Sequence, residues 1–406
     1  MRKATIALAL LLTSAPIAAQ TIVFDPHLDL PKSATAPGWT GRADSTSQFD
    51  LDRARKGGLT TAAIAVFVPQ GTRDASSLAT AQRDFVTRDA AIHAVADRNP
   101  DIAAFARSPA DVRRIVASGK FAVVESLLNA WPLGDDLDAF DRWHARGVSI
   151  VGFVHAGNNQ FADSSRPSLP LGDRAGENGG LSPLGKQAVK RLNDLGVLID
   201  VSQLSDAAFD QVLALSRAPV IATHSDVRAI VDNGRNLTDA QLDALKAKNG
   251  VVAINAFSAY LHARSAATLK AVADLQSEYG LSAAKPAPLS ADRQAEYDRR
   301  YHDIVGREPK ATVKKLVDAI DYAVKRIGVD HVAISSDFNH GGGVTGWADV
   351  GETANVTAEL KRRGYTPKRI AQLWSGNVLR VWQAAIDARD PAYKPAVPPK
   401  AHGGRP

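Results

Sequence analysis

Residues 180–205, GLSPLGKQAVKRLNDLGVLIDVSQLS, contain one complete unit of the fold. Ser182-Pro183 is a typical helix start, Gly196 is a typical helix stop, and the apolar run Val197–Val201 follows directly. A helix that leads straight into a continuously apolar strand is typical of a parallel sheet covered by helices.

The same unit recurs along the chain from Gln20 onward. We count eight short apolar, β-branched runs, each followed by a loop and a helical pattern. They are Ile22–Phe24, Thr61–Val68, Phe121–Val124, Val148–Val154, Val197–Val201, Val220–Thr223, Val251–Asn255 and His331–Ser336. Eight such units predict an α/β fold, a closed (β/α)8 barrel of the TIM type.

The helix signals, and the change in composition after residue 389, predict one large domain over residues 20–389. Ser108-Pro109 starts a helix, and Thr238 with Gln241 forms a capping box. Residues 262–310 are polar and Ala-rich, and predict a helical insertion before the last strand. Residues 390–406 hold prolines and a Gly-Gly pair, so we expect a C-terminal tail that wraps around the domain or frays.

Composition limits the chemistry and the partners. The 406 residues include 49 Lys and Arg against 43 Asp and Glu, a net charge of +6, but the basic residues are scattered, so we expect no nucleic acid partner. The chain has no Cys, which excludes disulfides, thiolate ligands and a Cys nucleophile. A metal ion would have to be held by His, carboxylate or amide groups.

Residues 1–19 have the pattern of a secretory signal peptide. Arg2 and Lys3 precede the apolar run Ala4–Leu12, and Ala18-Ala19 offers a small-residue cleavage site. The run is too short to span a bilayer, so we expect a periplasmic or secreted protein without a stable membrane anchor. An uncleaved anchor is the alternative.

Potential metal ligands gather where the predicted strands end. His27 and Asp29 close the first run, spaced so that both side chains point the same way. Others end or follow later runs, and these are Glu125, His155, Gln203, His224 and Asp337. The carboxyl ends of barrel strands share one mouth, where imidazoles and carboxylates can hold a hydrolytic Zn²⁺ or a mixed divalent site. Each residue alone has an ordinary structural interpretation, and His93, inside a helical pattern, is expected on the solvated surface.

Several stretches together resemble the membrane dipeptidase family, the renal-dipeptidase-like metallopeptidases of the amidohydrolase group. The resemblance covers nearly the whole chain except the insertion and the tail. It is carried by Asp25–Pro31 (DPHLDLP), Gly147–Asp163 (GVSIVGFVHAGNNQFAD), residues 180–205 quoted above, Ala218–Thr238 (APVIATHSDVRAIVDNGRNLT) and Ile327–Phe338 (IGVDHVAISSDF).

The resemblance implies a two-zinc site. His27 and Asp29 would hold the first zinc ion, Glu125 would bridge the two ions, and His224 would hold the second. The family normally supplies a second histidine to the second ion where this chain has Gln203. Because an amide oxygen is a weaker ligand for Zn²⁺ than imidazole, we expect one tight site and a second that is weaker or holds another divalent ion. A mononuclear enzyme and a catalytically impaired binding protein are the alternatives.

The resemblance also implies the remaining roles. His155 would bind the scissile carbonyl or its oxyanion, Arg235 would bind the free carboxylate of the substrate, and Asp337 would transfer protons. We therefore expect an exported dipeptidase acting through a metal-activated water, with a C-terminal D-residue as an open question and a homodimer as a plausible assembly. An amidohydrolase of lactams, lactones or N-acyl amino acids would use the same site.

Overall fold

The computed structural model describes residues 21–283 and 286–396, so the predicted signal peptide and most of the tail lie outside the described residues. Nine strands form one parallel sheet in the order β1-β2-β4-β5-β6-β7-β8-β9, with β3 paired to β4 off this path. They are β1 (Phe24–Leu28), β2 (Thr61–Phe67), β3 (Ala103–Ala106), β4 (Phe121–Leu128), β5 (Val148–Gly152), β6 (Leu198–Asp200), β7 (Ile221–Ala222), β8 (Val251–Asn255) and β9 (Val332–Ser335).

The sheet closes into a nearly complete barrel. Asp29 N donates to Phe338 O at 2.9 Å and Asp337 N donates to His27 O at 3.1 Å, which joins the end of β1 to the loop after β9. The predicted (β/α)8 barrel is therefore confirmed. Strand β3 was not predicted, because its Ala-Ala-Phe-Ala sequence lacks the β-branched residues that signal a strand.

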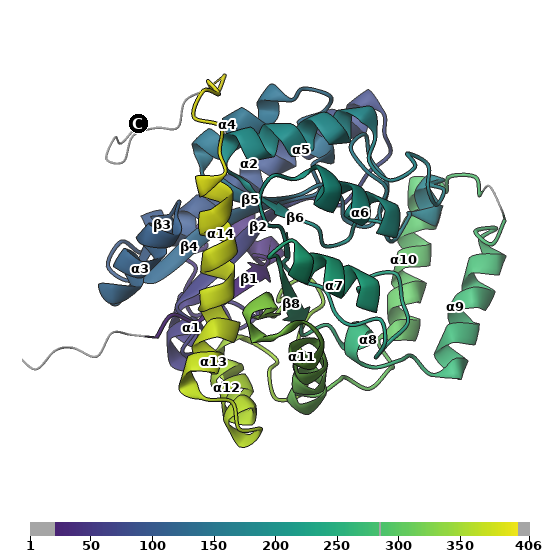
Figure 1. The fold of residues 1–406 in the computed structure, drawn as a ribbon. Helices are drawn as coiled ribbons and strands as arrows, with labels where there is room; N and C mark the ends of the chain where they lie inside the picture. The colour runs from purple at the N-terminus through teal and green to yellow at the C-terminus, as the bar shows by residue number, and fades with distance from the viewer. Residues whose placement is uncertain (1–20, 284–285, 397–406) are drawn as a thin grey trace, which may run out of the picture.

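Helices follow the strands and cover the outside of the barrel (Figure 1). They are α1 (Leu51–Gly57), α2 (Ala75–Asp97), α3 (Pro109–Ala117), α4 (Asp138–Arg146), α5 (Pro183–Leu195), α6 (Asp206–Leu215), α7 (Asp239–Ala247), α8 (Ser258–Leu261), α9 (Ala266–Glu278), α10 (Ala291–Val305), α11 (Val313–Ile327), α12 (Thr353–Arg362), α13 (Pro367–Ala371) and α14 (Asn377–Asp387). None of these helices of the described residues is long and apolar enough to cross a membrane.

The predicted helix signals act as caps. Ser108 and Ser182 accept hydrogen bonds in the first turns of α3 and α5, and Thr238 forms the capping box of α7 with Gln241. Gly196 ends α5 at a φ of 77°, a left-handed conformation that glycine adopts without strain.

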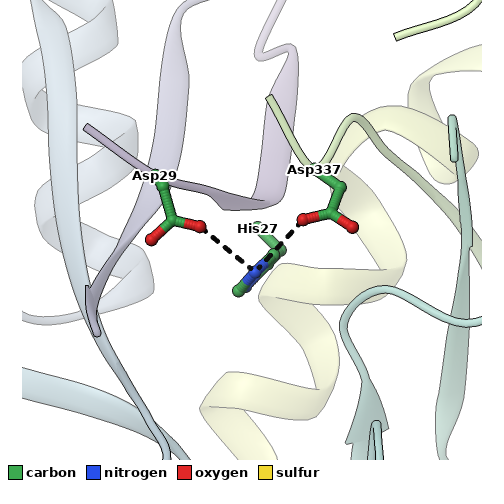
Figure 2. Close-up of side chains that lie close together, drawn as sticks. All are labelled: His27, Asp29 and Asp337. Atoms are coloured by element: carbon green, nitrogen blue, oxygen red, sulfur yellow. Dashed lines mark ion pairs between the residues drawn. The ribbon is translucent and has the colours of Figure 1, made fainter. Parts of the chain in front are cut away.

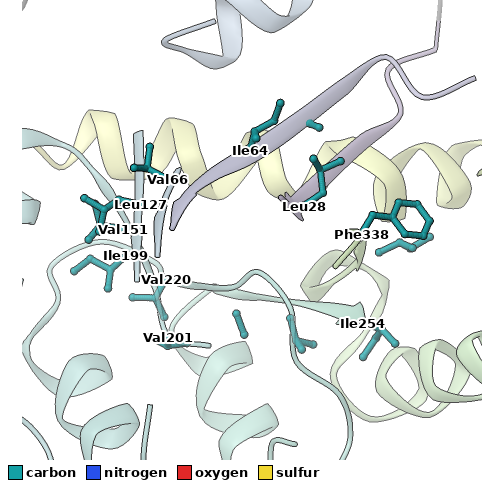
Figure 3. Packing of buried hydrophobic residues seen from close by; sticks show 14 of the residues in the cluster. Leu28, Ile64, Val66, Leu127, Val151, Ile199, Val201, Val220, Ile254 and Phe338 are labelled. Carbon is teal, nitrogen blue, oxygen red and sulfur yellow. The ribbon is translucent and has the colours of Figure 1, made fainter. Parts of the chain in front are cut away.

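Alternate residues along each strand face opposite sides of the barrel wall. The outward side chains belong to one buried cluster with side chains of the surrounding helices, and Leu28, Ile64, Leu127 and Ile199 are among those drawn in Figure 3. The inward side chains Ala63, Val124, Leu198, Ala253 and Ala333 pack in one cluster with Val378 and Trp382 of α14. Hydrogen bonds from Asn377 to Val329 O and Val332 O, and from Arg380 to Asn249 O, place α14 at the N-terminal strand ends. The C-terminal strand ends form the other mouth, where the polar residues lie.

Two peripheral segments pack against the barrel. Within the predicted insertion, α9 and α10 pack on each other at one side of the barrel (Figure 1), around a small core of Leu275, Tyr279, Leu281 and Tyr297. At the start of the predicted tail, Tyr393 Oη donates to Asp141 Oδ2 at 2.8 Å, so this part of the tail docks against α4.

Candidate metal centre

Two carboxylates flank one imidazole at the mouth of the barrel. The Nε2 atom of His27 lies 4.0 Å from Asp29 Oδ2 and 3.7 Å from Asp337 Oδ1 (Figure 2). All three side chains are buried, and their ligand atoms lie within 4.8 Å of one another. Segments from opposite ends of the chain build this cluster because β1 and the loop after β9 meet at the closure of the barrel.

The loop after β9 holds Asp337 in position. Asp337 has a φ of 58°, an uncommon conformation for a residue with a side chain, and such backbone strain concentrates at functional sites. Asn255, at the end of β8, donates from Nδ2 to Asp337 Oδ2 at 3.2 Å. Burial raises the pKa of Asp337, which suits a carboxyl group that must both take up and release a proton.

His340 belongs to the same cluster, and the sequence analysis did not identify it. Its Nδ1 lies 2.7 Å from Asp29 Oδ2. Loss of hydration lowers the pKa of His340, but the Asp29 carboxylate outweighs that effect and the net shift is upward. The available signal was its position three residues after Asp337, in the loop that follows the last strand.

A second group of polar side chains lies next to the first. The ring of His224 stacks on that of His27 with centroids 3.8 Å apart. Gln203 Nε2 lies 2.9 Å from His224 Nε2, and Gln203 Oε1 accepts from Arg166 Nη2 at 3.0 Å. The same Arg166 Nη2 lies 3.4 Å from His155 Nε2. Arg166 is a second site residue that the sequence analysis missed, because it follows no strand.

Loss of hydration and nearby cationic side chains lower the pKa of His155 and His224 well below the usual value for histidine. The lowered pKa favours the neutral imidazole, the form that can act as a metal ligand or accept a hydrogen bond.

Arg235 lies beside this group with unused hydrogen-bond donors. Its Nη2 donates to His224 O at 2.9 Å, and its guanidinium carbon lies 5.1 Å from the ring centroid of Tyr260. The side chain is only 3% exposed, yet Nε and Nη1 have no hydrogen-bond partner. Because buried unpaired donors are costly, this arrangement is suited to an anionic ligand.

Glu125 does not join the cluster, which corrects the expectation that it bridges two ions there. The strand β4 continues to Leu128, so Glu125 lies within it, paired with the outward-facing Ile64 of β2. Its carboxylate faces α2, 3.5 Å from His93 Nε2, and Asp89 completes this separate cluster. His93 is thus half-buried against Glu125 instead of solvated. Because successive side chains along a strand point to opposite faces, Glu125 faces the outside of the barrel and Leu128, three residues later, faces the inside.

The first cluster fits a divalent metal ion. His27 Nε2 is buried without a hydrogen-bond partner and points between two carboxylates, so His27, Asp29 and Asp337 are the residues that could hold the ion. One imidazole with carboxylates is a common ligand set for Zn²⁺ and related ions. When bound, such an ion lowers the pKa of a water molecule and polarises a carbonyl group.

The fold and this cluster define a metal-dependent hydrolase built on a (β/α)8 barrel. The sequence model described as "Membrane dipeptidase (Peptidase family M19)" matches residues 13–395. The chain therefore belongs to the membrane dipeptidase family, a family of metallopeptidases that hydrolyse dipeptides.

Individual relatives agree with this assignment. The crystal structure of the probable dipeptidase PvdM from Pseudomonas aeruginosa is 44% identical, with a TM-score of 0.85 over 91% of this chain and 96% of that one. A metallopeptidase from Rhodobacter sphaeroides, solved with a phosphinate mimic of L-Ala-D-Ala, shares the fold at 24% identity and a TM-score of 0.72 over 90% of this chain and 99% of that one. Dipeptidase tcpJ of Claviceps purpurea is 28% identical over 85% of this chain and 71% of its own length.

Proposed function

We propose that this protein is an exported dipeptidase that hydrolyses short peptides with the help of a zinc ion held by His27 and Asp29. The observation that supports this most directly is the unpartnered, buried Nε2 of His27 between the carboxylates of Asp29 and Asp337. Asp337 lies in the same cluster, so it serves either as a further ligand or as the acid-base group. We propose the second role for it because Asn255 holds its other oxygen and leaves Oδ1 toward the cluster.

The substrate is proposed to be a dipeptide with a free C-terminal carboxylate. The unused Nε and Nη1 donors of Arg235 support this, because a guanidinium can form two parallel hydrogen bonds with a carboxylate. His155 lies near the same mouth, in ring contact with Phe67 and His340, and is proposed to face the scissile carbonyl.

The direct experiment is hydrolysis of L,L and L,D dipeptides by protein that has been stripped of metal and reloaded with Zn²⁺, Mn²⁺ or Co²⁺. We expect turnover that a chelator abolishes and added metal restores. The Asp29→Asn variant should lose bound metal and turnover together. Failure of the reloaded wild-type protein to hydrolyse any dipeptide in the set would refute the proposed activity.

The chain keeps one feature that favours a binding protein as the second candidate. Gln203 stands at a position that the resemblance gives to a histidine ligand, and its amide contacts His224 directly. A binding protein would bind dipeptides without any metal-dependent hydrolysis. Binding heats in calorimetry with the same peptides, without turnover in the hydrolysis assay, would therefore identify a binding protein.

Export is proposed from residues 1–19 alone. Expression of the full chain in a Gram-negative host, followed by fractionation and N-terminal sequencing, should give a periplasmic protein that begins at Gln20. A cytoplasmic protein that retains Arg2 and Lys3 would refute export and leave the catalytic proposal intact.

A further inference from the structure

The polar groups beside the first cluster are satisfied by one another, in a hydrogen-bond chain with one direction. Arg166 Nη2 donates to Gln203 Oε1 (3.0 Å), and the Gln203 amide then donates from Nε2 to His224 Nε2 (2.9 Å). His224 Nδ1 lies 2.8 Å from Thr223 Oγ1, which itself donates to Asp200 Oδ2 at 2.5 Å. Since the Thr223 hydroxyl hydrogen is used by Asp200, Nδ1 of His224 is the donor.

In this arrangement His224 has no free nitrogen lone pair with which to bind a metal ion. A neutral imidazole has one lone pair on its ring nitrogens, and here that lone pair, on Nε2, accepts from the Gln203 amide. Gln203 Oε1, the other atom that could bind a cation, already accepts from Arg166. A second metal ion would have to break both hydrogen bonds.

The inward-facing residues of β4 offer no carboxylate in place of these ligands. Leu128 is the inward residue at the end of β4, buried and paired in register with Phe67, whose ring contacts His155 and His340. An apolar side chain therefore stands where a bridging ligand from β4 would be needed. The residues present do not fit a second metal ion.

The positive charge of Arg166 lies where a second metal ion would be expected. The guanidinium of Arg166 spans Gln203 and His155, and its Nε is buried without a hydrogen-bond partner. A cation in front of His155 Nε2 favours a lone pair on that nitrogen, so His155 has no proton there to donate to a substrate oxygen. Arg166 does have donors to offer.

We propose that the mouth of the barrel holds a single divalent cation, on the His27 side, and that Arg166 supplies the second positive charge of the site. In this role Arg166 donates an N–H to the substrate carbonyl oxygen as that oxygen gains negative charge. The catalytic half of this inference rests on the proposed function, whereas the count of metal ions does not.

The metal count is measured on the holoprotein by elemental analysis and by zinc titration calorimetry. We expect one equivalent for the wild-type protein and still one for Gln203→His, because Arg166 and Leu128 remain in place. Glu125→Gln removes a carboxylate from the separate cluster of Asp89, His93 and Glu125, so two equivalents that persist after this change in either protein would overturn the proposal.

The role of Arg166 is tested with a phosphinate dipeptide analogue, which mimics the tetrahedral state. Arg166→Met should weaken binding of the analogue about 100-fold or more, the usual effect of removing one oxyanion donor, and should lower kcat by a similar factor. Arg166→Lys should recover part of the loss. The matched control is Arg174→Met, which removes an exposed charge from the same loop.

Unchanged binding of the analogue by a folded Arg166→Met would overturn the role of Arg166. If the wild-type protein hydrolysed no dipeptide but bound the analogue in an Arg166-dependent way, the proposed function would fail, whereas the single metal ion and the contact of Arg166 with the tetrahedral group would stand. Thermal unfolding of each variant shows whether it is folded.

Discussion

Among single residues, Arg235 allows the most specific prediction about the substrate, which is that it carries a free carboxylate. Its two unused donors predict that Arg235→Met raises KM for free dipeptides about ten- to a hundredfold, because a hydrogen bond to a charged group contributes about 1.5–3 kcal/mol and about 1.4 kcal/mol is a factor of ten. Steady-state kinetics on dipeptides and their C-terminal amides measure this. An equal loss on the amides would show that Arg235 does not bind the carboxylate.

Glu125 lies outside the metal centre, so it should affect the pH dependence of stability and not catalysis. Burial raises the pKa of Glu125 from 4.5 to about 7. A carboxyl group whose pKa is higher in the folded than in the unfolded state stabilises the protein most below the unfolded value, and that contribution is lost as the pH rises through about 7. Glu125→Gln removes the buried charge, so its free energy of unfolding relative to the wild-type value should rise between pH 5 and pH 8.

Urea unfolding at the two pH values measures the effect. Glu296→Gln, at an exposed position on α10, is the matched control and should follow the wild-type protein at both. Parallel curves for Glu125→Gln and the wild-type protein would show that Glu125 has the same pKa in the folded and the unfolded protein, so that burial does not raise it.

The sequence could identify several site residues because they follow predicted strands. His27, Asp29, His155, Gln203, His224 and Asp337 could all be placed at the barrel mouth in this way. Arg166 and His340 could not, since they lie in loops whose path only the folded barrel fixes. Glu125 was misplaced because the predicted strand ended at Val124. The strand continues to Leu128, so Glu125 lies within it and faces outward instead of lying at the rim.

At the scale of elements, helix caps are the features that the sequence predicts best, since a cap depends on residues within one turn. Thr238 and Gln241 form both hydrogen bonds of the capping box of α7. Thr238→Ala should lower the free energy of unfolding by about 1 kcal/mol. Ser290, at the start of α10, makes no side-chain cap hydrogen bond, so Ser290→Ala is a matched control. Equal effects in urea unfolding would contradict the capping contribution.

Strand β3 shows the limit of this approach. It lies off the main path of the sheet and pairs only with β4, so its Ala-rich residues become a strand through tertiary contact and not through local preference. The barrel prediction survived this omission because eight other strands carry the closed sheet.

For the whole molecule, the metal centre coincides with the closure of the barrel. His27 and Asp29 end the first strand, Asp337 follows the last, and two backbone hydrogen bonds join these segments. The hydrogen bonds of this closure hold His27 and Asp29 in place, so an ion bound by them would bind only the closed, folded protein. Binding of this kind stabilises the folded state by about 2.7 kcal/mol when the free ion is at 100 times its Kd.

Metal removal should therefore lower the Tm of the wild-type protein by a few degrees, and re-addition of zinc should restore it. The Asp29→Asn variant should unfold at the same temperature with and without chelator, because it has lost a ligand at the closure. Scanning calorimetry at fixed protein concentration measures both. A wild-type Tm that does not change with chelator would mean that no stabilising ion binds at the closure. Equal shifts in both proteins would place the responding ion at another site.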